Sequence, residues 1–195
     1  MLALAESRES LKTLILNGSP KKNGDTEALV RELASHLSGE VRIISCCNDI
    51  RPCNDCRYCW VNIGCSIDDE MQDVYKFLEE CSNIVIASPI WFSSISGPLL
   101  NIASRIQSVF AASYFQNKKL LLKEKKGVII IVGAQQETKE IPTQIALGIL
   151  KYMNVHRPSV TKIYSLDTNN LPAEKDEAAL KKCREVAKML NESCE

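Results

Sequence analysis

The sequence has no net charge and no long apolar run. Lys plus Arg and Asp plus Glu number 24 each, so the chain has no long-range field that would collect nucleic acid or an anionic membrane surface. No apolar run approaches the about 20 residues that a membrane-spanning helix needs. An apolar start at residues 1–5 is interrupted at residues 6–9 before a signal-peptide core could form. These absences exclude nucleic acid and membrane partners and predict a cytoplasmic protein.

The two best-known phosphate-binding signatures are also missing. A Walker A loop needs Gly-Lys followed by Ser or Thr, and a dinucleotide fingerprint needs Gly-x-Gly-x-x-Gly; neither occupies residues 17–26. A hydroxyl-rich turn stands there instead, between an apolar run at 14–16 and an amphipathic pattern that begins after Thr26.

Such a turn leads a strand into a helix N-terminus, where unpaired N–H groups and the helix dipole attract an anion. Its hydroxyl, cationic and glycine residues are Ser19, Thr26, Lys21, Lys22, Gly18 and Gly24. Together they suit a phosphomonoester. The alternative is an ordinary turn in which Asp25 or Thr26 caps the helix.

The remaining pattern predicts a single domain over residues 1–195, a length that suits one full-sized core. Strands are expected at 14–16, 41–45, 84–87, 127–133 and 159–164, and helices after Thr26 and at 70–81, 98–110, 141–153 and 173–190. Right-handed crossovers then give an α/β, doubly wound, five-stranded parallel sheet. Ligands bind beyond the carboxyl ends of such strands, which selects the loops at 17–26, 88–97 and 133–139.

Cysteine is abundant, and its distribution is uneven. The chain has nine cysteines, an odd number that does not fit a complete set of intramolecular disulfides. Four of them lie in a long loop at 48–69, after the second strand, with the spacing C-x-x-C-x-x-C-x5-C: Cys53, Cys56, Cys59 and Cys65. This spacing is typical of the ferredoxin run that holds a [4Fe-4S] cluster, whereas structural zinc usually takes two separated pairs. Zinc, a disulfide and unbound thiols remain as alternatives.

Three stretches of the chain resemble a known family. They are Asn17-Gly18-Ser19-Pro20-Lys21 with Gly24 and Thr26; Pro52-Cys53 through Cys65 with Asp68-Asp69-Glu70-Met71; and Ser88-Pro89-Ile90-Trp91-Phe92 with Ser96-Gly97-Pro98-Leu99. Together they resemble the NADPH-dependent FMN reductase branch of the flavodoxin-like proteins and, within it, the iron-sulfur flavoproteins. The resemblance covers nearly the whole chain. It implies a non-covalently bound FMN, with its phosphate in the first loop and its ring against the third and fourth.

The FMN contacts expected on this basis are Ser19, Lys21, Asn23, Gly24, Asp25, Thr26, Ser88, Pro89, Ile90, Trp91, Phe92, Ser93, Gly133, Ala134 and Gln135. The sequence departs from the family at three places. Asp25 stands where the family commonly has an uncharged Asn or Ser, so its charge would repel a phosphate unless it faces the helix cap or Lys21 and Lys22. Ser104 precedes Arg105 where an acidic residue is common, and the fourth loop lacks the paired glycines that often follow Gln135.

The chain is therefore expected to be an FMN-dependent oxidoreductase, or an electron-transfer iron-sulfur flavoprotein. It would move electrons from ferredoxin or NAD(P)H to an acceptor through FMN and a [4Fe-4S] cluster. The alternatives are an NAD(P)H-dependent FMN or quinone reductase without a cluster, and a non-enzymatic thiol or zinc sensor. No residue need act as nucleophile or general acid, because the cofactors carry the chemistry. The family's habit of assembly implies a homodimer or homotetramer, in which Trp91 could close a neighbour's flavin site.

Overall fold

The computed structural model describes residues 11–121 and 123–192. The apolar start at 1–5 and the charged residues that interrupt it lie outside these ranges. In the part of the chain that is described, no helix is both long enough and apolar enough to pass through a membrane.

The expected five-stranded parallel sheet is confirmed. Its order is β2-β1-β3-β5-β6, and all neighbours on this path pair in parallel. The strands are β1 (Lys12–Asn17), β2 (Glu40–Ser45), β3 (Asn83–Trp91), β5 (Lys125–Val132) and β6 (Val155–Ser165). This is the flavodoxin order 2-1-3-4-5, since the two-residue β4 (Ser94–Ile95) stands off the path and pairs only with β3. The strand order reverses at β1 and β3, where a ligand crevice is expected.

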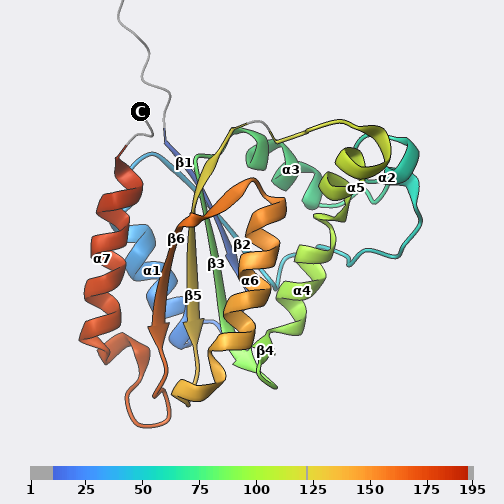
Figure 1. The fold of residues 1–195 in the computed structure, drawn as a ribbon. Coiled ribbons are helices and arrows are strands. Elements are labelled where there is room, and N and C mark those ends of the chain that lie inside the picture. The colour runs from blue at the N-terminus through green and yellow to red at the C-terminus, as the bar shows by residue number, and fades with distance from the viewer. Residues whose placement is uncertain (1–10, 122, 193–195) are drawn as a thin grey trace, which may run out of the picture.

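Helices cover both faces of the sheet (Figure 1). The helices α1 (Asp25–Ser35) and α7 (Glu177–Asn191) pack on one face, and α3 (Met71–Glu80), α4 (Gly97–Ser104) and α6 (Glu140–Tyr152) on the other. Each face has its own apolar core. In β1, Leu14 and Leu16 belong to the core under α3, α4 and α6, and Ile15 belongs to the core under α1 and α7; all three side chains are buried. Strands covered on both faces explain why the apolar runs lack polar alternation.

Five details differ from the sequence-based expectations. The helix predicted at 98–110 is two helices, α4 and α5 (Gln107–Gln116), and the supposedly irregular loop at 48–69 contains α2 (Tyr58–Val61). The turn that ends β3 is a tight hairpin into β4, with positive φ at Phe92 and Ser93. The closing helix begins as a short 3-10 turn, η2 (Ala173–Lys175), and a second, η1 (Gln136–Thr138), precedes α6.

The break between α4 and α5 has a tertiary cause. At the junction the Arg105 and Ile106 amides bond to carbonyls only three residues back, at 3.1 and 3.0 Å. The carbonyl of Arg105 accepts a hydrogen bond from the Tyr75 hydroxyl at 2.7 Å, and its side chain runs into the cysteine loop. Because these partners come from other parts of the chain, the apolar periodicity of the segment gave no sign of the break.

Candidate functional site

A cleft of about 390 Å³ opens at the carboxyl ends of the central strands, as the fold rule predicts. It is lined by ten of the expected FMN contacts: Ser19, Lys21, Gly24, Asp25, Thr26, Pro89, Ile90, Trp91, Gly133 and Ala134. The structure adds Pro20, Val132 and Thr168. The first, third and fourth loops therefore meet at one place, although they are far apart in the sequence.

The first loop is held in shape by its own polar groups. The Ser19 amide donates to the Asn17 side-chain oxygen at 3.0 Å, and the Lys21 amide donates to the Ser19 hydroxyl at 3.3 Å. Gly24, rather than Asp25 or Thr26, is the N-cap of α1, so the two cap residues considered from the sequence were wrong. Among the described residues, the amides of Asp25 and Thr26 have no acceptor, and such free amides at a helix start suit an anion.

The carboxylate of Asp25, at the end of this loop, accepts a hydrogen bond from another part of the chain. One of its carboxylate oxygens accepts the Ala173 amide at 2.8 Å, which ties α1 to η2. The donor that the structure shows is thus an amide of η2, whereas the partners expected from the sequence were the helix cap or Lys21 and Lys22.

A buried network joins the first loop to the third. The Ser96 hydroxyl donates to the Gly18 carbonyl at 2.7 Å, and the Ser96 amide donates to the Ser88 hydroxyl at 2.9 Å. A Cβ on Gly18 would lie 2.7 Å from the Leu99 Cβ. The glycine is thus required by close packing against α4. Ser88 is fully buried inside this network rather than in the cleft wall.

Four other expected contacts also lie outside the cleft lining. Phe92 and Ser93 form the tip of the β3–β4 hairpin, where Phe92 is fully exposed. The Asn23 side chain accepts a hydrogen bond from Arg31 at 3.2 Å. Gln135 is exposed at the start of η1.

Thr168 is a cleft residue that sequence reasoning missed. Its hydroxyl and its amide both donate to the Gly133 carbonyl, each at 3.1 Å. Gly133 packs against Ile90, whose Cδ1 would lie 2.8 Å from a Cβ at this position, so a larger residue there would displace the end of the Ile90 side chain. The available signal was the polar turn after β6, whose carboxyl end meets the same edge of the sheet.

The four expected metal-binding cysteines line a second, smaller hollow, together with Ser66, Ile67 and Arg105. Burial raises the pKa of the Cys59 thiol, and the neighbouring Cys53, Cys65 and Cys56 raise it further. A hydrogen bond with Ser66 lowers the pKa of Cys56. The thiols are therefore close enough to affect one another electrostatically.

Arg105 clamps both ends of the loop that carries these cysteines. Its buried guanidinium donates to the Arg51 carbonyl at 2.8 Å, the Ile67 carbonyl at 3.2 Å and the Asp69 carboxylate at 2.7 Å. Burial acts to raise the pKa of Asp69, but hydrogen bonds from Arg105 and from the amides of Arg51 and Met71 bring it below its usual value. The carboxylate therefore stays charged and keeps the clamp closed.

Gln116 and an aromatic pair fix the middle of the loop. The Gln116 amide donates to the carbonyls of Cys59 and Asn62, both at 2.9 Å. Trp60 stacks on Phe115 with ring centroids 4.3 Å apart. Sequence reasoning missed these supports, because α2 and α5 come together only in the tertiary structure.

The arrangement of the four thiols bears on which metal group they fit. In the described ranges, no three Cys, His, Asp or Glu side chains surround a single-ion position. A [4Fe-4S] cluster binds each of its thiolates through a different iron atom, so its four ligands do not share a single-ion position. The donor set of four thiols fits an iron-sulfur cluster in this respect.

The sheet order and the loops that gather at its carboxyl edge define a flavodoxin-like α/β protein. The comparison with protein families is more specific. The chain belongs to the NADPH-dependent FMN reductase family, whose model matches residues 11–163. It is thus a flavin-dependent oxidoreductase, and FMN is the cofactor that the family implies.

Individual proteins show the same relationship. The chain is 26% identical over 188 residues to an iron-sulfur flavoprotein of Methanosarcina thermophila, covering 92% of this chain and 93% of that protein. It is 28% identical over 130 residues to an iron-sulfur flavoprotein of Methanocaldococcus jannaschii, covering 65% of this chain and 64% of the relative.

Several solved structures have a similar fold, and one of them is the NAD(P)H:quinone oxidoreductase from Methanothermobacter marburgensis. It superposes with a TM-score of 0.71 at 14% identity, covering 95% of this chain and 98% of that one. At this identity the likeness concerns the fold alone.

Proposed function

We propose that this protein is an electron-transfer iron-sulfur flavoprotein. FMN would lie in the cleft, a [4Fe-4S] cluster would be held by Cys53, Cys56, Cys59 and Cys65, and the electrons would come from ferredoxin or NAD(P)H. The observation that carries the proposal is the common hollow of the four thiols, which Arg105 ties to the flavodoxin-like domain. FMN supplies the ability to take two electrons as hydride and release them singly, while the protein supplies position and electrostatics.

The cleft lining offers two kinds of chemistry. Ser19, Lys21 and Thr26 suit the phosphate, because hydroxyls, a cation and helix-terminal amides all favour an anion. Ile90 and Trp91 suit a flat aromatic ring. Backbone donors near that ring would stabilise the negative charge of reduced flavin.

The main rival is an NAD(P)H-dependent FMN or quinone reductase whose cysteines hold no cluster. Membership of the NADPH-dependent FMN reductase family favours it, since reduction by a nicotinamide is the activity that describes this family. The two functions differ in one property that can be measured directly, which is iron bound at the cysteine loop. A thiol or zinc sensor would differ from both by lacking flavin.

The test begins with protein purified without air. We expect flavin absorption above a broad brown band that bleaches with dithionite, and about four irons and four sulfides per chain. Flavin bands without iron would contradict the proposal and leave the plain reductase. Bound metal without flavin would favour the sensor.

A pair of cysteine variants sharpens this test. Cys56→Ser removes one proposed ligand from the exposed side of the hollow, and we expect it to lose iron but keep FMN. Cys47→Ser is the matched control, because Cys47 is also exposed but lies outside the four-cysteine pattern. Equal iron contents in the two variants would contradict the assignment.

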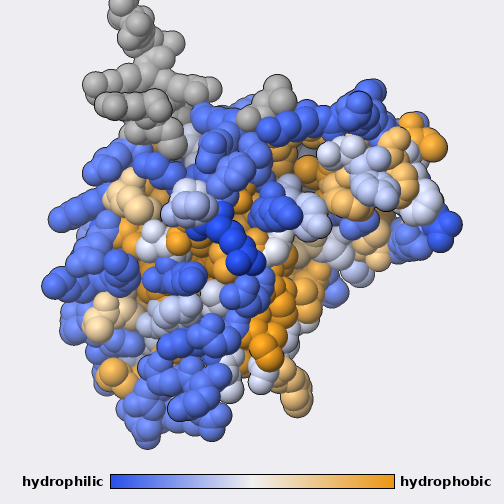
Figure 2. Space-filling view, viewed as in Figure 1, coloured by the Kyte–Doolittle hydropathy of each residue, from blue (hydrophilic) through white to orange (hydrophobic). Residues whose placement is uncertain are grey.

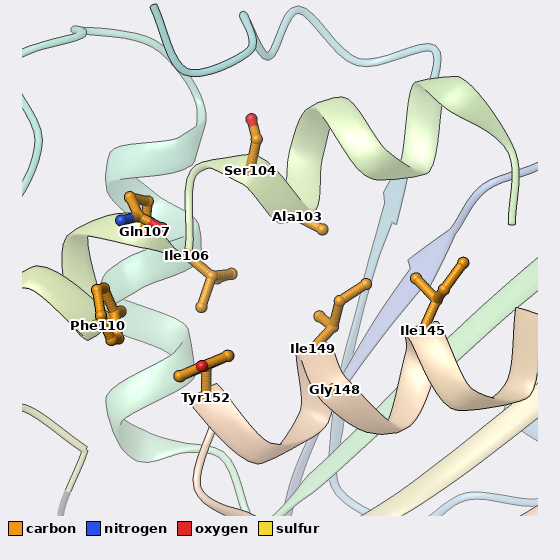
Figure 3. Close-up of a pocket in the computed structure, with 9 residues that line it drawn as sticks. All are labelled: Ala103, Ser104, Ile106, Gln107, Phe110, Ile145, Gly148, Ile149 and Tyr152. Atoms are coloured by element: carbon orange, nitrogen blue, oxygen red, sulfur yellow. The ribbon is translucent and has the colours of Figure 1, made fainter. Parts of the chain in front are cut away.

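We also propose a homodimer or homotetramer in the cytoplasm, where thiols stay reduced. A groove of about 420 Å³ has α4 and the start of α5 on one side and α6 on the other. Its lining includes Ile106, Ile145, Ile149 and Tyr152, which point into it (Figure 3). Apolar surface also follows these helices in the space-filling view (Figure 2). With Trp91 half-exposed and Phe92 fully exposed near the cleft, a second copy could bury them. If Trp91→Ala changed neither the sedimentation of the protein nor its retention of flavin, the proposal that Trp91 closes the flavin site of a neighbour would be contradicted.

A further inference from the structure

One N–H group of the Arg105 guanidinium has no hydrogen-bond acceptor among the described residues. The Arg105 side chain is completely buried, and its Nη1 and Nη2 atoms bond to Arg51, Asp69 and Ile67. Its Nε–H has no acceptor in the described part of the chain. A buried N–H without a partner is energetically unfavourable, so a group outside the described residues is expected to accept this hydrogen bond.

The position of Arg105 suggests what completes its bonding. Arg105 and the four cysteines line the same hollow. After burial and the hydrogen bond with Asp69, the groups that interact electrostatically with Arg105 are Tyr75 and then Cys65. The guanidinium is thus within electrostatic range of a proposed cluster ligand.

We propose that the Arg105 Nε–H donates a hydrogen bond to a sulfur of the group held by the four cysteines, and thereby raises its reduction potential. The inference rests on the proposed iron-sulfur function. Reduction adds one electron from the donor to the cluster and makes it one charge more negative, with no covalent bond formed or broken. Hydrogen bonds to the sulfurs and nearby positive charge favour that more negative form.

The competing explanation is that Arg105 only clamps the loop. Its bonds to the carbonyls of Arg51 and Ile67 would then be its whole function, and the potential of the cluster would not depend on the Nε donor. The two explanations make different predictions for a variant that keeps the charge but lacks Nε.

Arg105→Lys is that variant, since lysine keeps a cation for Asp69 but carries all its donors on one terminal nitrogen and has no Nε–H. At a fixed applied potential, we expect the ratio of oxidised to reduced cluster to rise about tenfold. This corresponds to a reduction potential about 59 mV more negative for a one-electron couple. The matched control is Arg57→Lys in the same loop. Arg57 stacks over Trp60 at 4.7 Å with its side chain 61% exposed, and we expect this change to leave the potential unaltered.

The measurement is an anaerobic spectroelectrochemical titration of each protein, after its iron content has been determined. A wild-type protein without iron would overturn the proposed function and this inference with it. Full iron in Arg105→Lys with the wild-type potential would overturn this inference alone. A shift in Arg105→Lys that Arg57→Lys does not share would support it.

Wild-type protein provides a second test if Arg105→Lys loses its iron. The protein is labelled with 15N in its arginine side chains and reduced, and pulsed electron paramagnetic resonance detects nitrogen coupled to the cluster. We expect a coupling that persists in labelled Arg57→Lys. Its absence from the reduced wild-type cluster would overturn the proposal.

Discussion

At the scale of single residues, the structure shows what the acidic side chain in the proposed phosphate-binding turn contacts. Asp25 lies in the first turn of α1, beside Lys21 and Thr26 in the cleft lining. Its carboxylate is engaged by the Ala173 amide at 2.8 Å. Asp25 therefore contributes a tertiary hydrogen bond while its charge still opposes a phosphate nearby.

Replacing Asp25 separates these two effects. Asp25→Asn keeps an oxygen that can accept the Ala173 amide but removes the charge, so we expect FMN to bind about threefold more tightly, or about 0.7 kcal/mol. Quenching of FMN fluorescence during titration of the apoprotein measures the affinity. Asp25→Ala is the control that also removes the acceptor, and it should lower stability by about 1 kcal/mol. Weaker FMN binding by Asp25→Asn would show that the carboxylate aids the site.

At the scale of elements, the cleft depends on how closely the first loop approaches α4. We expect Gly18→Ala to destabilise the protein by about 1–3 kcal/mol, because its Cβ would lie 2.7 Å from the Leu99 Cβ and 2.8 Å from the Ser96 hydroxyl. Gly97→Ala is the matched control, since nothing lies within 4 Å of its Cβ. Urea unfolding of the two variants measures the difference. Equal stabilities would show that the loop yields without cost.

The cysteine loop should open in acid before the sheet unfolds. The folded pKa of Asp69 is lower than the ordinary value of 3.8. The stabilisation it provides is therefore complete above that value and is lost as the pH falls through the lower, folded pKa. We expect exchange of amides at 53–65 to accelerate over that range, by at most about tenfold per pH unit for one proton. Hydrogen exchange with mass spectrometry, corrected for intrinsic rates, measures this, and Asp69→Asn should abolish the dependence.

At the scale of the whole molecule, the two cores share one sheet, because alternate side chains of the same strands enter each of them. We therefore expect one cooperative thermal transition. FMN at 100 times its dissociation constant should add about 2.7 kcal/mol to the free energy of unfolding, since it binds only the folded cleft. Calorimetry with and without FMN measures both properties. Two separate transitions would contradict the prediction of a single domain.

The sequence by itself determined the flavodoxin-like sheet, because strands such as β1 and β5 are buried on both faces and appear as unbroken apolar runs. It also determined which loops line the cleft, since parallel strands bring their carboxyl ends to one edge. Ser19, Trp91 and Gly133, from three such loops, border the same cleft.

Only the tertiary structure decided the support of these sites. Ser88 lies behind the cleft rather than in its wall, because its hydroxyl accepts the Ser96 amide. Thr168 reaches the cleft because β6 ends beside β5. The break at Arg105 and its clamp on the cysteine loop join partners 36 to 54 positions apart. Local periodicity reports which face of an element is buried, and it carries no information on which distant polar group will satisfy a buried donor.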